Sequence, residues 1–265
     1  MNDTRPRYGV AVLVLGVCSL KGGVGKTSVT LGLASAALER GLRTLVIDLD
    51  PQGDATMALG ARPDTADVAS VLELPGAATM EAATVRSSWS DDGLDVLVGS
   101  ERSAEHDRLR DTDVERLRYA LSWVNGYDLV LIDCPPSLGG LTRTGLVAAD
   151  RAIVVTEPGL FAVMAVGRAM RTIDELRRGP APALQPLGIV VNRVRARSVE
   201  QAFRLEELQT LYGPLVLAPA VPERAALQQA QGAAQPVHAW PGPASAELGR
   251  TFDALLDKAL RAPRR

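Results

Sequence analysis

The sequence predicts a doubly wound α/β fold, in which a mostly parallel β-sheet carries helices on both faces. Short apolar runs rich in β-branched residues recur along the chain, and stretches of helical composition separate them. Several of these runs are apolar at nearly every position, which is the pattern of parallel strands covered on both faces. A chain of 265 residues is long enough to bury one sizeable core of this kind.

Seven apolar runs are predicted strands, and the clearest helices lie between them. The strands are Val10–Ser19, Thr44–Asp48, Leu94–Val98, Leu129–Asp133, Ala152–Thr156, Leu187–Val191 and Leu215–Ala218. The helices are Lys26–Arg40, which stops before Gly41, a segment from a candidate capping box of Thr112 and Glu115 to about Asn125, and Phe161–Arg178. We expect residues 1–8 to be disordered and 9–262 to form a single domain.

Composition narrows the function classes. The formal net charge is -2 and the pI is about 5.8, so any binding to nucleic acid must come from a local basic patch. The two cysteines, Cys18 and Cys134, lie in predicted strands, which favours buried reduced thiols and a cytoplasmic compartment. The apolar run near the N-terminus is too short to span a bilayer, and a buried first strand explains it.

A glycine-rich loop follows the first predicted strand and opens the first predicted helix. Its members are Lys21, Gly22, Gly23, Val24, Gly25, Lys26, Thr27 and Ser28. Glycines let backbone N–H groups turn toward phosphate oxygens, and the helix N-terminus adds positive potential. We therefore expect a nucleoside triphosphate here, with Lys26 on the β- and γ-phosphates and the Thr27 hydroxyl on Mg²⁺. A chance glycine turn is the alternative, and the strand–helix context argues against it.

Carboxylates end two of the predicted strands. Asp48 and Asp50 stand at i and i+2 where the second run stops, and Asp133 closes the fourth. Ligands of doubly wound sheets bind at the carboxyl ends of the strands. An aspartate that closes an apolar strand is also the usual partner of the Mg²⁺ shell in phosphate-loop enzymes. These residues are thus expected beside the nucleotide.

The loop departs from the general phosphate-loop pattern, because Leu20 stands where that pattern has glycine and Lys21 follows it. With this extra lysine the loop resembles the deviant Walker A motif of the ParA/MinD family of ATPases, and most closely that of the ParA/Soj branch. The run Asp48–Gly53 resembles the family's Asp-x-Asp-Pro-Gln-Gly motif, and Asp133–Pro136 its Asp-x-Pro-Pro motif. The resemblance extends from about residue 10 to about residue 260 and is densest through 150.

The resemblance implies a phosphate-loop NTPase fold and Mg²⁺-dependent hydrolysis of ATP by a face-to-face homodimer. In that dimer Lys21 would cross to the partner's nucleotide, Asp50 would orient the attacking water, and Asp48 would support the Mg²⁺ shell. Segment 138–150 would correspond to the second switch, which responds to the γ-phosphate. Asn192 would contact the adenine edge, although an asparagine there is also a good turn residue. Pro222 would lie in a second loop that contacts the base.

For the biological role, the ParA/Soj branch implies nonspecific DNA binding with ATP and hydrolysis stimulated by a ParB-like partner. The cycle would partition chromosomes or plasmids, or position another cargo on the nucleoid. Basic residues for DNA phosphates fall in three places: Arg193, Arg195, Arg197 and Arg204, with only Glu200 opposing them; Arg224; and Lys258, Arg261, Arg264 and Arg265. A solvated helix face and a ragged tail are the alternative interpretation. Trp240–Leu248 lacks the basic residue common in the family.

Two other protein classes share single features with this sequence. A MinD-like ATPase would bind membrane through a C-terminal amphipathic helix, and Thr251–Arg261 has such a face, although packing of that helix on the sheet explains the pattern better. We therefore do not expect a membrane partner. An electron-transfer protein would bind an iron–sulfur cluster, but no cluster motif surrounds Cys18 or Cys134.

Overall fold

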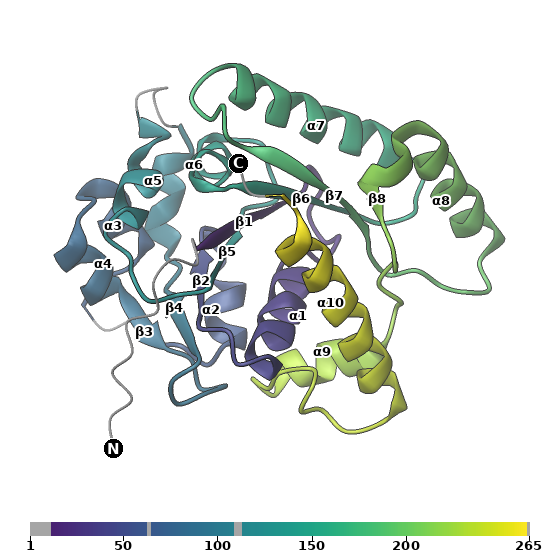
Figure 1. The fold of residues 1–265 in the computed structure, drawn as a ribbon, viewed down its shortest axis with the longest axis horizontal. Helices are drawn as coiled ribbons and strands as arrows, with labels where there is room; N and C mark the ends of the chain where they lie inside the picture. Colours follow the sequence, from purple (N-terminus) through teal and green to yellow (C-terminus); the bar gives the residue numbers. More distant parts are fainter. Residues whose placement is uncertain (1–11, 63–64, 109–112, 264–265) are drawn as a thin grey trace.

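The computed structural model describes residues 12–62, 65–108 and 113–263, which contain one eight-stranded sheet (Figure 1). Its strands are β1 (Leu13–Cys18), β2 (Thr44–Asp48), β3 (Thr84–Arg86), β4 (Leu94–Leu97), β5 (Leu129–Asp133), β6 (Arg151–Thr156), β7 (Gln185–Val191) and β8 (Val216–Leu217). The order across the sheet is β3-β4-β2-β5-β1-β6-β7-β8. Only the β3–β4 pair among these is antiparallel.

Helices cover both faces of the sheet, which confirms the predicted doubly wound fold (Figure 1). One face carries α1 (Lys26–Glu39), α2 (Asp54–Ala58), α9 (Ala225–Gly232) and α10 (Pro243–Arg261). The other carries α3 (Val68–Glu73), α4 (Ala77–Ala83), α5 (Arg116–Leu121), α6 (Gly140–Ala148), α7 (Ala162–Arg178) and α8 (Val199–Tyr212). Two described 3-10 helices, η1 (Glu101–Arg108) and η3 (Gly213–Leu215), connect elements.

The strand predictions agree with the structure where the apolar run is continuous. β2 and β5 have the predicted bounds, and the other predicted strands differ by a few residues at their ends. Strand β3 was not predicted, because this edge strand has three residues and none of them is buried. Short, half-exposed edge strands give no apolar run for a sequence pattern to detect.

The predicted end of one helix agrees with the structure, whereas another helix is shorter than predicted. Helix α1 ends before Gly41, as predicted, and this glycine adopts a left-handed φ of 67°. Helix α5 is much shorter than predicted and ends at Leu121. Glu115 is its N-cap residue but makes no side-chain capping hydrogen bond, and Thr112 lies outside the described residues. The predicted disordered segment 1–8 and the tail residues Arg264 and Arg265 also lie outside them.

The topology brings three strand ends together at the centre of the sheet. β1 lies between β5 and β6, and the loop that follows β1 opens α1. Val17 of β1 is in register with Asp133 of β5, which is in register with Asp48 of β2. This is the point where the strand order reverses, and doubly wound sheets bind ligands at such switch points.

Two further features bear on the sequence predictions. Cys18 and Cys134 are both free and fully buried, as predicted. Burial raises the pKa of Cys18 to about 12, against a smaller lowering by Lys26, so this thiol stays protonated at neutral pH. Within the described ranges, every helix is too short or too polar to cross a bilayer.

Candidate functional site

The glycine-rich loop has the backbone that a phosphate cradle needs. Gly23 and Gly25 have left-handed φ angles of 80° and 84°, and Gly25 is the N-cap of α1. Gly25 has a second constraint, since a Cβ on it would lie 2.3 Å from Asn192 Nδ2. A Cβ on Gly23 would instead meet nothing within 4 Å, so the loop is open on that side. The sequence therefore requires glycine where the loop turns and packs, and leaves room for a ligand above it.

Lys26 and Asp50 form an almost buried ion pair at the start of α1. Lys26 Nζ lies 3.9 Å from Asp50 Oδ2, and the two side chains are 6% and 9% exposed. The Gln52 N–H donates to Asp50 Oδ1 at 3.1 Å, which holds the carboxylate in place. A buried ammonium requires a negative partner. Asp50 supplies it in this arrangement, and a phosphate can take over that role from the open side of the loop.

Asp133 connects the end of β5 to the first turn of α1. Thr27 Oγ1 donates to Asp133 Oδ2 at 2.7 Å, and Thr30 Oγ1 donates to Asp133 Oδ1 at 2.9 Å. Burial raises the pKa of Asp133 to about 6, although Lys26 and the two threonine hydrogen bonds act in the opposite direction. The Thr27 hydroxyl and the Asp133 carboxylate thus lie together, and their role in a Mg²⁺ shell stays a prediction.

Asp48 occupies a different environment from Asp133. Its Oδ2 accepts hydrogen bonds of 2.8 Å from both the N–H and the hydroxyl of Thr56, and its Oδ1 accepts one of 3.2 Å from Asp50 N. Burial, with the nearby charge of Asp133, raises the pKa of Asp48 to about 7, while the Thr56 bonds lower it. These bonds shape the turn that carries Asp50. The metal role assigned to Asp48 stays a prediction.

Asn192 and Pro222 meet at a pocket on the other side of the loop. Asn192 is 2% exposed, and its Nδ2 donates to the Val24 carbonyl at 2.8 Å. The pocket has a volume of about 260 Å³ and is lined in part by Ser28, Asn192, Pro222 and Gln228. The structure therefore brings the two residues predicted to contact the base to one cavity beside the phosphate loop.

Three residues at the site were not identified from the sequence. Thr30 and Thr56 hold Asp133 and Asp48, and Gln231 of α9 accepts a hydrogen bond of 3.2 Å from Ser28 Oγ. Thr30 lies one helical turn after Thr27, so helical spacing could have identified it. Thr56 lies three residues after the Asp48–Gly53 motif, in a different element from Asp48, and helical spacing gives no such signal for it. Gln231 gives no such signal, because it lies 203 residues from Ser28.

The arginines predicted to contact DNA form more ion pairs with acidic residues than the neighbouring sequence suggests. Ion pairs join Arg193 to Glu157 at 2.8 Å, Arg195 to Glu223, Arg224 to Glu247 at 2.8 Å, and Arg204 to Glu200 and Glu207 at 2.8 and 3.1 Å. The expectation that Glu200 alone opposes the first group was wrong, because the fold brings in acids from other elements. Arg197 and Lys258 are exposed, and Arg261 pairs with Asp257.

Lys21 differs from Lys26 in its surroundings. Its side chain is exposed, and its carbonyl accepts a hydrogen bond of 2.9 Å from Ser19 Oγ. Lys21 also lines a pocket of about 210 Å³ together with Leu160 and Phe161, which precede α7. Leu160, Phe161 and Met164 are 60%, 67% and 64% exposed. An exposed lysine thus lies beside apolar side chains at the edge of the phosphate loop.

Comparisons with known proteins agree with this site. Residues 12–185 match the model of a family described as an AAA domain. The chain is 33% identical over 230 residues to the chromosome partitioning protein ParA of Caulobacter vibrioides, covering 84% of this chain and 85% of that protein. It is 30% identical over 232 residues to the chromosome-partitioning ATPase Soj of Thermus thermophilus, covering 82% and 83%.

Among solved structures, the chain is similar to that of cobyrinic acid a,c-diamide synthase from Mycobacterium smegmatis with a bound ATP analogue and magnesium. The two are 31% identical with a TM-score of 0.79, over 96% of this chain and 98% of that one. The deviant loop with Lys21, the aspartates in register beside it and these matches agree with one another. This chain belongs to the ParA/MinD family of deviant Walker A ATPases.

Proposed function

We propose that this chain is a ParA-like ATPase that dimerises when it binds ATP, binds DNA without sequence preference and partitions or positions a cargo with a ParB-like activator. The observation that carries the proposal is the pair of lysines at one loop. Lys26 is buried at the head of α1, whereas Lys21 is exposed at the edge of the loop. DNA binding of this kind would keep the protein on the nucleoid, in the cytoplasm.

The residues present fit ATP with Mg²⁺. The loop is open above Gly23, Lys26 offers a buried ammonium, and the Thr27 hydroxyl lies 2.7 Å from the Asp133 carboxylate. Mg²⁺, when bound, would neutralise charge on the phosphate oxygens. Asp50 is held beside Lys26 and would orient the attacking water for in-line displacement of the γ-phosphate. Catalysis in such a site is mostly positioning and charge neutralisation.

The surface around Lys21 supports a homodimer. Isolated exposed apolar residues are common, but Leu160, Phe161 and Met164 lie within a few residues of one another. Leu160 and Phe161 share a pocket with Lys21. A second copy of the chain would cover these side chains and accept Lys21 at its own nucleotide. ATP binding would then be measurable as a change from monomer to dimer.

DNA binding is supported by the basic residues near β7 and α9. The ion pairs of Arg193, Arg195 and Arg224 lie at the surface. Exposed pairs of this kind contribute only about 0–1 kcal/mol, so phosphates can replace the carboxylates at little cost. Arg197 is exposed and has no ion pair with another described residue, so it needs no such exchange.

The MinD-like alternative is less favoured by the packing of α10. The apolar side chains Phe252, Leu255 and Leu256 are 0%, 2% and 0% exposed, within the core cluster that also contains α1. Membrane binding through this face would first require α10 to leave the core. Co-sedimentation with liposomes that is lost on deleting Ala254–Arg265 would revive this alternative.

An amide-forming synthase activity, as the name of the similar mycobacterial protein indicates for that protein, is also less favoured here. Both cysteines of the chain are fully buried, and burial raises the pKa of each thiol, so neither is placed as a nucleophile toward an amide donor.

DNA binding measured with ATP, with ADP and without nucleotide, at two salt concentrations, tests the proposal. We expect binding to any duplex with ATP only, weakening steeply with salt because phosphate contacts release counterions.

The Asp50→Ala variant should keep ATP-dependent binding but lose turnover. Arg197→Ala should weaken DNA binding, whereas Arg178→Ala, an exposed arginine on α7, serves as the matched control. Normal hydrolysis by Asp50→Ala, or DNA binding indifferent to nucleotide, would contradict the proposal.

A further inference from the structure

The 3-10 helix η1 begins next to a segment that is tied to the proposed nucleotide site. It follows β4 directly, and the Gly99 N–H donates to Thr56 Oγ1 at 2.8 Å. The same hydroxyl donates to Asp48 Oδ2 at 2.8 Å. Thr56 thus connects Gly99, two residues before η1, to the Asp48 carboxylate at the end of β2 through two hydrogen bonds.

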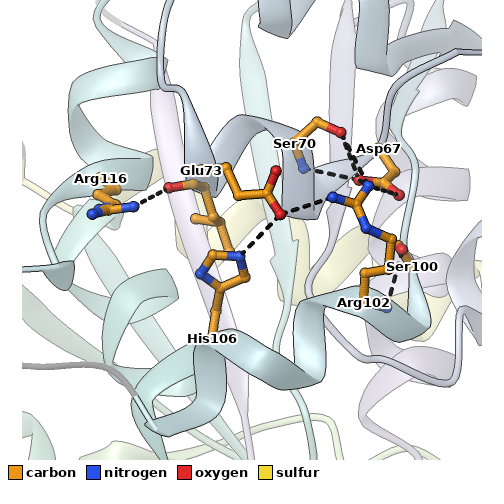
Figure 2. A network of polar contacts seen from close by, with 8 residues as sticks. Asp67, Ser70, Glu73, Ser100, Arg102, His106 and Arg116 are labelled. Atoms are coloured by element: carbon orange, nitrogen blue, oxygen red, sulfur yellow. Dashed lines mark hydrogen bonds and ion pairs between the residues drawn. The ribbon is translucent and has the colours of Figure 1, made fainter.

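Ion pairs hold one side of η1 against α3 (Figure 2). Arg102 contacts Asp67 at 3.3 Å and Glu73 at 2.8 Å, and His106 Nε2 lies 4.0 Å from Glu73 Oε1. Asp67 is in turn the N-cap of α3 and accepts a hydrogen bond of 2.9 Å from Ser70 N. These contacts join two turns of η1 to α3.

The last turn of η1 lies directly against the start of α6. The Leu141 N–H donates to Asp107 Oδ1 at 3.2 Å. A Cβ on Gly139 would lie 2.4 Å from Asp107 Oδ1, and a Cβ on Gly140 would lie 2.8 Å from the Asp107 carbonyl oxygen and 3.0 Å from that of His106. The two backbones can approach this closely because position 140 is glycine, whereas at Gly139 the added Cβ would meet the Asp107 side chain.

The start of α6 is connected to the segment that follows Asp133. Thr142 Oγ1 lies 2.7 Å from the Ser137 carbonyl oxygen and donates to it, and it also lies 3.3 Å from that of Pro135. A displacement of the first turn of α6 would therefore displace Pro135–Ser137 as well. These residues come directly after the carboxylate that contacts Thr27.

We propose that Asp107 is a positioning residue for ATP hydrolysis, which holds the first turn of α6 and, through it, segment 135–140 in the geometry that hydrolysis requires. The proposal rests on the ATPase function proposed above and deepens it. Asp107 acts through the backbone of α6. Pro136 lies beside the phosphate loop, since a Cβ on Gly22 would lie 3.7 Å from Pro136 Cβ. Small displacements of groups near a reacting phosphate are enough to slow the reaction severalfold.

Steady-state kinetics of the full-length chain with Mg²⁺ and ATP test the role of Asp107. Asp107→Ala should lower kcat by about 3- to 10-fold and leave KM for ATP within about twofold, because the phosphate loop is untouched. Asp107→Asn keeps an acceptor oxygen for Leu141 N and should restore at least about half of the wild-type kcat. Glu105→Ala, at an exposed position of the same helix, is the matched control and should behave as wild type.

A second variant and a second readout keep the test decisive. Gly140→Ala would push η1 and α6 apart and should lower kcat in the same way. In the nucleotide-free chain, amide hydrogen exchange in residues 138–148 should be faster with Asp107→Ala and unchanged with Glu105→Ala. Wild-type kcat in Asp107→Ala, or an Asp107→Asn variant as slow as Asp107→Ala, would overturn the proposal. A wild-type chain without any ATP hydrolysis would instead overturn the proposed function itself.

Discussion

At the scale of single residues, the site is a cluster of buried ionisable groups with unequal surroundings. Each of Lys26, Asp48, Asp50 and Asp133 is at most 6% exposed when the whole residue is counted. Their identities follow from sequence motifs, but the number of hydrogen bonds that each carboxylate accepts depends on Thr30 and Thr56, which the motifs do not contain. Burial of carboxylates without bound cations makes the nucleotide-free site electrostatically costly.

This cost predicts how stability depends on pH. Burial raises the pKa of Asp133 from 3.8 to about 6, so its contribution to stability is complete below about pH 4 and is lost as the pH rises through about 6. Thermal unfolding of the nucleotide-free chain should therefore shift to lower temperature between pH 5 and pH 8. Asp48, whose pKa burial raises to about 7, contributes to the same shift, so Asp133→Asn removes only one of two titrating groups and should reduce the shift by about 3 °C. Equal pH slopes for the two proteins would refute this assignment.

At the scale of elements, the packing of α1 against α10 depends on a residue with no side chain. A Cβ on Gly32 of α1 would lie 2.3 Å from ring atoms of Phe252, which is fully buried in α10. The sequence predicts α1 and the apolar face of Thr251–Arg261 in α10, yet nothing in it pairs these two positions, which are 220 residues apart. The contact also protects the apolar face that a membrane-binding helix would need.

Substitutions at this contact should be costly and coupled. Gly32→Ala should destabilise the fold by about 1–3 kcal/mol because it overpacks the contact. Phe252→Ala should cost about 3–5 kcal/mol because it leaves a cavity. The double variant Gly32→Ala/Phe252→Leu should cost less than the sum of Gly32→Ala and Phe252→Leu measured singly, by denaturant unfolding. Gly232→Ala, where a Cβ would meet nothing within 4 Å, is the control and should be close to neutral.

At the scale of the whole molecule, our proposal is that a second subunit completes the site at the exposed Lys21 and the apolar residues beside it. Leu160 and Phe161 line the pocket that Lys21 borders. The missing glycine at Leu20 and the lysine after it were the sequence signals for this arrangement. If two subunits share the site, nucleotide binding and dimerisation are linked equilibria, and each shifts the other.

Substitution of Lys21 should therefore affect dimerisation, whereas substitution of Lys26 should affect nucleotide binding. Lys21→Ala should bind a fluorescent ATP analogue with an affinity within about threefold of wild type, because the cradle and Lys26 remain. It should stay monomeric in light scattering with a slowly hydrolysed ATP analogue, whereas the wild-type chain dimerises. Lys26→Ala should lose nucleotide binding altogether. A Lys21→Ala chain that dimerises normally would rule out the trans role.

Local sequence was sufficient for the parts of this protein that are contiguous in the chain. The phosphate loop, the two aspartate motifs and the central strands each depend on residues within one turn or one strand, where backbone geometry translates spacing directly into position. The edge strand β3 and the true extent of α5 could not be predicted in the same way, because packing against neighbours outweighs weak local preferences there.

Folding decided everything that depends on residues far apart in the chain. Three sets of contacts join elements that the topology brings together. They are the ion pairs between glutamates and the predicted DNA-binding arginines, the hydrogen bond from Asn192 to Val24, and the hydrogen bond between Asp107 and α6. Charge neutralisation, close packing and hydrogen bonding act over a few ångströms of space, and sequence separation says little about such distances. The sequence therefore identifies the chemistry of this site, and the fold determines which residues hold that chemistry in place.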